Sequence, residues 1–274
     1  MADVALVTGT SSGMGLEAAV ALARGGLTVV ATMRDTSRDG ALRSAAAEAG
    51  VEVDVRRLDV TDEDGMRECV EGVLADHARI DVLVNNAGRG CVGTAEQLSM
   101  DTIREQLEVN YLGVVALTKL VLPGMRESGR GRVVTVTSVG GAIGQPFADA
   151  YCGAKFAVEG FMQSLAVVAE RFGIGVSVIE PAAVASEFVA NVTRPEETDD
   201  PYSALFDAYL RRTAGAFAAA QSSAGAGAAI AACATSTERR FRWQTSEGAT
   251  AFVGMSLADL DGSRVLAATS TWLD

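Results

Sequence analysis

The sequence lacks the groups that would build a disulfide framework, a zinc site or a histidine-dependent active site. Its four cysteines are scattered and form no CxxC pair, so the pattern favours reduced thiols and predicts no metal site. Reduced thiols are typical of the cytoplasm, where we expect the protein. The chain has one histidine, His77, which lies in a polar segment.

Positive charge and long apolar runs are also scarce. Lysine and arginine number 23 against 35 acidic residues, a net charge of −12, which disfavours nucleic acids and anionic membranes as partners. We find no charge-free apolar stretch of about 18 residues and therefore predict no membrane span. No basic segment with a long apolar run precedes Val4–Val7, so we expect no signal peptide.

What the sequence does contain is a regular alternation of apolar runs and helical patterns. The expected strands are Val4–Val7, Leu27–Ala31, Val51–Leu58, Ile80–Val84, Val133–Thr137 and Val176–Ile179. The expected helices are Gly15–Ala23, Ala41–Ala49, Asp62–Asp76, Asp101–Leu122 and Tyr151–Phe172. This alternation predicts one α/β domain over residues 1–274, a Rossmann fold with a doubly wound parallel sheet and helices on both faces. Ligands of such sheets bind outside the carboxyl ends of the strands.

Beyond the sixth strand the pattern loosens. Residues 180–201 carry prolines and acids and are predicted as a loop, and Tyr202–Ala220 follows as a helix. Because this loop and helix come after the last core strand, we expect about 186–220 to cover the substrate. Residues 221–274 form a C-terminal extension, in which Arg240–Thr245 is a short extended candidate.

A glycine-rich turn, Thr8–Gly15 with the sequence TGTSSGMG, follows the first strand and opens the first helix. Glycines let the backbone approach a pyrophosphate, and the helix N-terminus offers free N–H groups. A glycine turn without a ligand is the alternative. The same letters also match the GxSxG nucleophile elbow of α/β-hydrolases, but that chemistry needs a suitably placed histidine base. His77 and the early position of the turn disfavour a hydrolase.

Three polar side chains suggest proton transfer at an alcohol oxygen. Tyr151 and Lys155 are four residues apart in a predicted helix, so they share one face. Ser138 ends the apolar run 132–137, which is predicted as a buried strand. A phenol, an ammonium and a hydroxyl brought together can move a proton onto or off such an oxygen. A tyrosine and a lysine on an exposed helix face are the alternative.

The turn TGTSSGMG, the segment NNAG at Asn85–Gly88, Ser138 and the motif YCGAK occur together and in order. Their joint spacing resembles the short-chain dehydrogenase/reductase family from about Val4 to Phe188. The segments TMRD, SVGG and YCGAKFAVEGFMQSLA are similar to the branch of estrogenic hydroxysteroid and retinol dehydrogenases.

The resemblance implies a catalytic tetrad made of Asn110, Ser138, Tyr151 and Lys155. It also implies cofactor contacts at Gly9, Ser11, Ser12, Gly13, Met14, Gly15, Asp59, Val60, Asn86, Ala87, Gly88, Tyr151, Lys155, Pro181, Ala182, Val184 and Ser186. Taken alone, Asp59–Asp62 reads as a helix N-cap region and Asn85–Gly88 as an ordinary turn.

The end of the second strand bears on the choice of cofactor. Thr32 stands where NAD-preferring relatives usually carry aspartate, and Arg34 can bind the adenosine phosphate of NADP. The following Asp35 weakens this argument, and a solvated loop charge is the alternative for Arg34. We predict that NADP(H) is preferred and that NAD(H) is possible.

The expected function is an NAD(P)-dependent interconversion of a lipophilic ketone and a secondary alcohol, of steroid, retinoid, polyketide or fatty-acyl type. Tyr151 is the expected general acid in reduction, and Lys155 and an oxidised nicotinamide are expected to lower its pKa from ~10. The alternative is a non-catalytic NADP-binding regulator on the same fold.

The expected substrate pocket lies above Ser138–Gly144 and beneath the loop from Ala183 onward, with further walls from Gln145, Pro146, Phe147, Phe188, Phe206 and Tyr209. Core packing is the alternative for these aromatics and is favoured for Phe206. The helices Asp101–Leu122 and Tyr151–Phe172 resemble the family's subunit-contact pair, which implies a homodimer or homotetramer.

Overall fold

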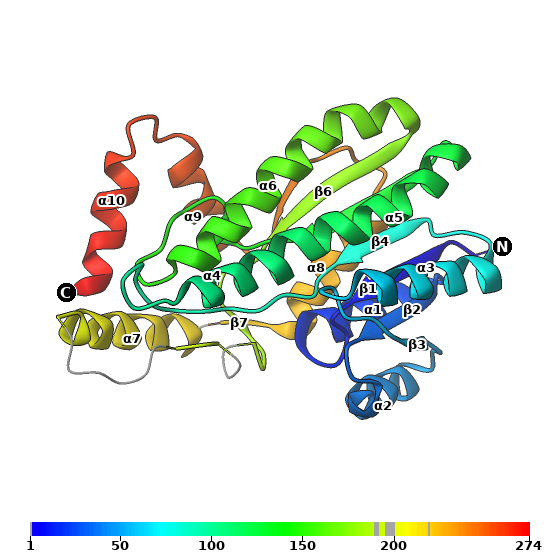
Figure 1. Ribbon diagram of the computed structural model, residues 1–274, viewed down its shortest axis with the longest axis horizontal. Coiled ribbons are helices and arrows are strands. Elements are labelled where there is room, and N and C mark those ends of the chain that lie inside the picture. Colours follow the sequence, from blue (N-terminus) through cyan, green and yellow to red (C-terminus); the bar gives the residue numbers. More distant parts are fainter. Residues whose placement is uncertain (1, 189–191, 195–200, 219) are drawn as a thin grey trace.

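The centre of the molecule is a sheet of seven parallel strands in the order β3-β2-β1-β4-β5-β6-β9 (Figure 1). A computed structural model describes residues 2–188, 192–194, 201–218 and 220–274. The strands are β1 (Val4–Thr8), β2 (Thr28–Met33), β3 (Asp54–Arg57), β4 (Val82–Asn85), β5 (Gly131–Val136), β6 (Ile174–Glu180) and β9 (Arg242–Gln244). The strand order reverses between β1 and β4, the switch point at which ligands of doubly wound sheets bind.

Helices connect these strands. They are α1 (Gly13–Arg24), α2 (Gly40–Ala49), α3 (Glu63–His77), α4 (Met100–Leu107), α5 (Gly113–Ser128), α6 (Asp149–Ala169), α7 (Ser203–Ala218), α8 (Ser223–Thr235), α9 (Glu247–Leu257) and α10 (Ser263–Ser270). A two-stranded sheet pairs β7 (Val184–Ala185) with β8 (Gln221–Ser222). Short 3-10 turns lie at Thr36–Arg38, Val139–Gly141, Glu170–Phe172 and Thr271–Leu273.

Each face of the sheet packs against its own set of helices. Buried side chains of α3, α5 and α6 form one core cluster, and those of α1, α2 and α8 form the other. Alternation along β1 supplies both clusters, with Val4 and Leu6 in the first and Ala5 and Val7 in the second. Because both faces are covered, the central strands are mostly apolar, whereas the edge strands β3 and β9 carry charged residues. The predicted doubly wound α/β fold is therefore confirmed.

Several predicted boundaries change. The helix expected at Asp101–Leu122 is divided into α4 and α5 by a π-helical segment, Glu108–Leu112. Of the strand expected at Val51–Leu58, only Asp54–Arg57 pairs with a neighbouring strand, and these residues form β3. This strand lies at the edge of the sheet, where β2 is its one neighbour. The extended candidate Arg240–Thr245 contains β9, which pairs with β6.

The expected loop at 180–201 contains β7, and part of it lies outside the described residues. Beyond β9, the tail forms α9 and α10, which the sequence did not assign. Figure 1 shows this C-terminal part beside α7, at the end of the molecule opposite the N-terminus. The turn Thr271–Leu273 contacts α7, and Trp272 stacks on Phe252 of α9 with ring centroids 5.9 Å apart.

The continuous helical stretch Met100–Ser128 is, among the described residues, the one long and apolar enough to cross a membrane by length and composition. The stretch carries charged side chains, Lys119 among them, so it is not a charge-free run, and the absence of a membrane span stays a prediction. Its buried residues Val114, Leu117 and Val121 belong to a core cluster beside the sheet. These side chains pack against the sheet, and one helix of this length and composition is weak evidence for a membrane span.

Candidate active site

The glycine-rich turn comes very close to the segment after β4. Gly9 has a φ of +70°, and a Cβ there would lie 2.8 Å from the Cα of Ala87. A Cβ at Gly15 would meet the Asn86 amide and the Gly9 carbonyl oxygen. The N-cap of α1, Ser12, makes no side-chain capping hydrogen bond, so the first N–H groups of the helix have no side-chain acceptor there. These features together fit an anion held against backbone N–H groups.

Asn86 and Ala87 hold this turn in place. The Asn86 side chain donates to the carbonyl oxygens of Thr8 and Gly9, at 2.9 and 3.0 Å. The backbone N–H groups of Asn86 and Ala87 both donate to Thr8 Oγ1 at 3.0 Å. Thr8 was missed by sequence reasoning, although a hydroxyl at the end of the first strand is a usable signal. In the structure Asn86 therefore orients the turn.

The predicted contacts after β6 cross the carboxyl edge of the sheet: Pro181, Ala182, Val184 and Ser186. The Pro181 carbonyl accepts a hydrogen bond from the N–H of Val139, at 2.9 Å. At the other end, Ser186 Cβ lies 3.2 Å from the point that a Cβ on Gly13 would occupy. This segment thus runs from the Ser138 turn to the glycine-rich turn, which also includes the half-buried Ser11 and Met14.

The end of β2 presents one exposed arginine, Arg34. Asp35 is occupied as a cap, because its carboxylate accepts from the N–H and the hydroxyl of Ser37, at 3.0 and 2.7 Å. Those hydrogen bonds hold the pKa of Asp35 below its ordinary value. Thr32 is buried and its hydroxyl donates to the Val7 carbonyl, so it points into the sheet and not toward a ribose. The argument from Thr32 was therefore wrong in its geometry.

The segment after β3 caps α3. Asp62 is the N-cap and accepts from the Gly65 N–H at 3.0 Å, as the helix-cap interpretation predicts. Asp59 is half-buried and accepts from the N–H and the hydroxyl of Thr61, at 3.0 and 2.8 Å. Val60 is buried beside it. Both residues lie at the carboxyl edge of the sheet, where a cofactor contact was expected.

Three of the four predicted catalytic side chains meet where α6 crosses the end of β5. Tyr151 and Lys155 lie one turn apart on α6, with the Lys155 Nζ atom 5.9 Å from the centroid of the Tyr151 ring. The Ser138 side chain hydrogen-bonds to the Tyr151 hydroxyl. The buried Lys155 donates to the Val136 carbonyl at 3.1 Å.

The fourth residue, Asn110, lies fully buried in the π-helical segment. Its side chain accepts from the Arg89 N–H at 3.2 Å and donates to the Arg89 carbonyl at 2.8 Å and to Gln106 Oε1 at 3.0 Å. A Cβ on Gly88 would lie 2.9 Å from Asn110 Oδ1 and 3.6 Å from Lys155 Nζ. Asn110 therefore fixes the chain beside Lys155. Gln106, four residues earlier on the same helix face, was missed.

Burial opposes the charged form of both titratable groups. It raises the pKa of Tyr151 well above the ordinary 10, while the Ser138 hydrogen bond acts in the opposite direction. It lowers the pKa of Lys155 to about 8, while the charge of Glu159 acts in the opposite direction. In the protein without cofactor, desolvation of the Tyr151 phenolate therefore outweighs the groups that stabilise it, and the expected lowering of its pKa by Lys155 together with an oxidised nicotinamide stays a prediction.

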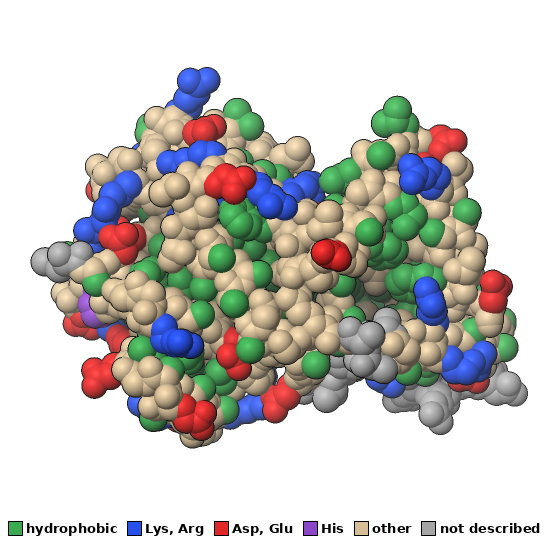
Figure 2. All heavy atoms as spheres, turned by 180° about the vertical axis from the view of Figure 1, so that it is seen from behind, with side chains coloured by type: hydrophobic (Ala, Val, Ile, Leu, Met, Phe, Trp, Pro, Cys, Tyr) green, Lys and Arg blue, Asp and Glu red, His purple; other side chains and the backbone are tan. Residues whose placement is uncertain are grey.

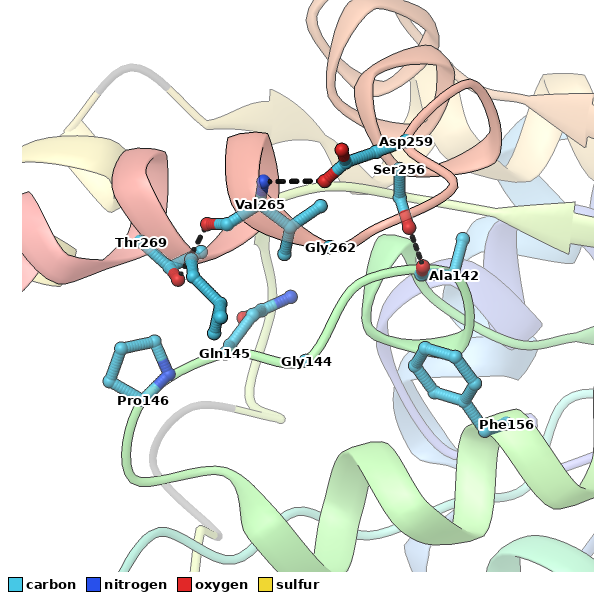
Figure 3. A pocket seen from close by; sticks show the side chains of 11 residues that line it. Ala142, Gly144, Gln145, Pro146, Phe156, Ser256, Asp259, Gly262, Val265 and Thr269 are labelled. Atoms are coloured by element: carbon cyan, nitrogen blue, oxygen red, sulfur yellow. Dashed lines mark hydrogen bonds between the residues drawn. The ribbon is translucent and has the colours of Figure 1, made fainter.

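A groove of about 560 Å³ opens next to the segment that follows Ser138 (Figure 3). One side is the predicted wall, with Ala142, Gly144, Gln145 and Pro146, joined by Phe156 from α6. The other side comes from the C-terminal extension: Ser256, Asp259, Gly262, Val265, Leu266 and Thr269. Figure 2 shows it as a notch between the C-terminal part and the main body, with hydrophobic side chains inside. The sequence predicted the first wall and missed the second.

The aromatic side chains predicted as walls do not line this groove. The Phe147 ring lies 5.0 Å from that of Phe206 and 5.4 Å from that of Tyr209, by centroids. Phe206 thus packs against Phe147 and Tyr209, but it is only half-buried and belongs to no core cluster, so its role as core or as pocket wall stays open. The Phe188 ring lies 6.1 Å from the Tyr151 ring, so the segment after β7 reaches the proposed catalytic tyrosine.

The hydrolase interpretation fails on geometry. His77 ends α3 and lies 3.8 Å from Asp54, the first residue of β3, at the amino edge of the sheet. The glycine-rich turn lies at the carboxyl edge, on the far side of the strands. In the part of the chain that the structure describes, no group of three or more His, Cys, Asp or Glu side chains could hold a metal ion.

A Rossmann sheet with a glycine-rich turn and a tyrosine–lysine pair defines a class of dinucleotide-dependent oxidoreductases. The family profile described as short chain dehydrogenase matches residues 3–197. The chain therefore belongs to the short-chain dehydrogenase family and is an oxidoreductase of that family, of the hydroxysteroid and retinol dehydrogenase branch.

Two curated relatives mark this branch. Retinol dehydrogenase 8 of Bos taurus is 37% identical over 94% of this chain and 86% of its own length. The 17-beta-hydroxysteroid dehydrogenase type 1 of Homo sapiens is 36% identical over 97% of this chain and 84% of its own length.

Solved structures agree with the fold. A short-chain dehydrogenase from Streptomyces avermitilis has a TM-score of 0.83 and 31% identity, over 100% of this chain and 98% of its own. Actinorhodin polyketide ketoreductase, solved with NADPH, has a TM-score of 0.76 and 31% identity, over 90% of this chain and 97% of its own.

Changing Gly15 to alanine tests the glycine-rich turn. We expect Gly15→Ala to weaken NADPH binding at least about tenfold, because the new Cβ meets Asn86 and the Gly9 carbonyl and must displace the turn. Fluorescence titration with NADPH measures the effect. Gly40→Ala is the matched control, since a Cβ there has no atom within 4 Å. Equal affinity in both variants would contradict the role of the turn.

Proposed function

We propose that the protein uses NADP(H) to interconvert a lipophilic ketone and the corresponding secondary alcohol. One observation carries this proposal. The Tyr151 hydroxyl, hydrogen-bonded to Ser138 and beside the buried Lys155, lies at the same edge of the sheet as the glycine-rich turn. Hydride transfer to a carbonyl requires a proton donor close to a bound dinucleotide. Here the proton donor and a turn that can hold a dinucleotide lie at one edge of the sheet.

The residues at this edge fit a dinucleotide cofactor. The uncapped start of α1 and the glycines that exclude a Cβ suit its phosphates, which Gly9 to Gly15 would hold. Asn86–Gly88, Asp59 and Val60 would contact the adenosine side, and residues 181–186 the nicotinamide side. The exposed Arg34 would bind the additional phosphate of NADP. When bound, the nicotinamide ring supplies or accepts the hydride.

The protein's own groups would handle the proton. Tyr151 would donate its proton to the carbonyl oxygen during reduction and take it back during oxidation. Ser138 would hydrogen-bond the same oxygen as charge develops on it. The Lys155 ammonium would stabilise the phenolate, with help from the positive charge of an oxidised nicotinamide. Asn110 would keep the segment at Gly88 and Arg89 beside Lys155.

The substrate we propose is lipophilic. The groove beside the Ser138 turn carries Phe156, Val265 and Leu266, and the Phe188 ring contacts Tyr151. The names of similar proteins point the same way: retinol, 17-beta-hydroxysteroid, polyketide and 3-ketodihydrosphingosine. The described residues of 186–220 and the C-terminal extension would cover the bound molecule.

A panel of lipophilic ketones tests this function. We expect NADPH oxidation with steroid, retinoid or long-chain ketones, and a loss of about 10²–10⁴-fold in kcat for Tyr151→Phe with NADPH binding retained. Tyr111→Phe, which removes a phenol hydroxyl elsewhere, is the control and should keep its turnover. Near-native kcat in Tyr151→Phe would exclude the proposed proton donor. NADPH binding without turnover of any ketone would instead favour the alternative function, a non-catalytic NADP-binding regulator.

Arg34→Glu tests the cofactor preference. Replacing the cation by a carboxylate should repel the adenosine phosphate and lower the NADPH-to-NADH ratio of kcat/KM at least about tenfold. Arg24→Glu makes the same change of charge at the end of α1 and is the matched control. An unchanged ratio in Arg34→Glu would show that NADP specificity arises elsewhere.

We further propose that the chain forms a homodimer or homotetramer through α5 and α6, which lie side by side (Figure 1). Exposed apolar side chains lie on α6 and in the segments that adjoin the two helices: Leu112, Val167, Val168 and Phe172. Val168→Glu should lower the mass measured by sedimentation, whereas Leu260→Glu in the exposed C-terminal part should not. A wild-type monomer at micromolar concentration would contradict this proposal.

A further inference from the structure

Three residues along one face of α6 contact three consecutive residues at the end of β5. Tyr151, Lys155 and Glu159 are spaced by four and therefore lie in line on the helix. Lys155 binds the Val136 carbonyl, the Glu159 carboxylate lies 2.7 Å from the Thr137 hydroxyl, and Tyr151 hydrogen-bonds to Ser138. Glu159 thus extends the predicted catalytic face by one turn, and nothing in the proposed reaction has yet used it.

A buried charge cluster surrounds Glu159. Arg242 of β9 forms ion pairs with Glu159 and with Glu180, and both carboxylates are buried. The Gln244 amide donates to the other oxygen of Glu180. Gly141 in the turn after Ser138 leaves the space for Glu159, since a Cβ there would meet the carboxylate. The last strand of the sheet is therefore tied to the catalytic helix through charge.

The hydrogen bonds indicate that this cluster can carry a proton on Glu159. Thr137 Oγ1 lies 2.7 Å from Glu159 Oε1 and 2.9 Å from the Ile179 carbonyl, but a hydroxyl has one proton for two acceptors. If Glu159 carries a proton, it can donate that proton to Thr137 Oγ1, and the Thr137 hydroxyl can donate its own proton to the Ile179 carbonyl. The cluster of Arg242, Glu159 and Glu180 then has no net charge. Burial, followed by the charge of Glu180, raises the pKa of Glu159 to about 7.

We propose that Glu159 is a positioning residue: it fixes Thr137 and so the adjoining Ser138, and its negative charge favours the ammonium form of Lys155. The charged groups that face Glu159 are Lys155 from its own helix, Glu180 from β6 and Arg242 from β9, while β5 contributes the neutral Thr137. The catalytic meaning of this inference rests on the proposed function, whereas the charge coupling does not.

The sign of the effect follows from charge. An ionised Glu159 raises the pKa of Lys155, which burial lowers to about 8. When Glu159 is protonated or replaced by a neutral side chain, the pKa of Lys155 must fall further. The Lys155 ammonium would then lose its proton at a lower pH than in the wild type. As the pH rises, carbonyl reduction would therefore begin to decline at a lower pH as well.

The chain allows a direct measurement, because it contains only two lysines, Lys119 and Lys155. NMR of the full chain carrying ¹³C-labelled lysine gives one titration curve for each, and the exposed Lys119 serves as an internal reference. In the wild type we expect Lys155 to titrate near pH 8 with a second inflection near pH 7 from Glu159. A single inflection for Lys155 would overturn the coupling even if no variant folds.

Glu159→Gln should move the Lys155 midpoint down by about one pH unit and remove the inflection near pH 7. Glu127→Gln, an exposed change on α5, should leave both features in place. An unshifted Lys155 midpoint in Glu159→Gln would overturn the proposed charge effect. Because this readout needs no turnover, it remains decisive even if the ketone panel disproves the proposed function.

Thr137→Val separates positioning from charge. It removes the hydroxyl that links Glu159 to the Ser138 turn but no charge, so kcat should fall about tenfold while the Lys155 midpoint stays near pH 8. The alkaline limb of kcat/KM for ketone reduction should shift in Glu159→Gln and stay in place in Thr137→Val. A Thr137→Val enzyme with wild-type kcat would overturn the positioning role.

Discussion

Parallel pairing is the constraint on which the whole site depends. Because β1, β4, β5 and β6 run in one direction, all four end at the same edge of the sheet. Each strand is followed there by one part of the candidate site: Gly9, Asn86, Ser138 and Pro181. Strands about 5 Å apart thus bring together groups that are separated by dozens of residues in the chain.

The edge becomes a site only because the backbone segments pack unusually closely. Gly9 and Gly15 let the first turn contact the segment after β4, and Gly88 leaves space between Asn110 and Lys155. Gly141 does the same between the Ser138 turn and Glu159. At each position a Cβ would separate two segments that the polar contacts hold together, so small residues and hydrogen bonds act jointly.

Burial gives the site its electrostatic character. It disfavours the phenolate of Tyr151 and the ammonium of Lys155 at once, so the free protein stabilises neither charge fully. A proposed cofactor with a positive ring and an ionised Glu159 would each restore part of that stabilisation. The cluster of Glu159, Glu180 and Arg242 extends this network from α6 to the last strand.

The sequence by itself determined the strand–helix alternation, the glycine-rich turn and the spacing of Tyr151 and Lys155, because periodicity and motif spacing are local properties. The tertiary structure alone decided which residues from distant segments meet. Arg242 reaches Glu159 across 83 positions, and the C-terminal part supplies a wall of the groove that no local pattern marks. The pKa direction of Tyr151 also lay beyond the sequence, since desolvation depends on everything packed around the phenol and not on its neighbours in the chain.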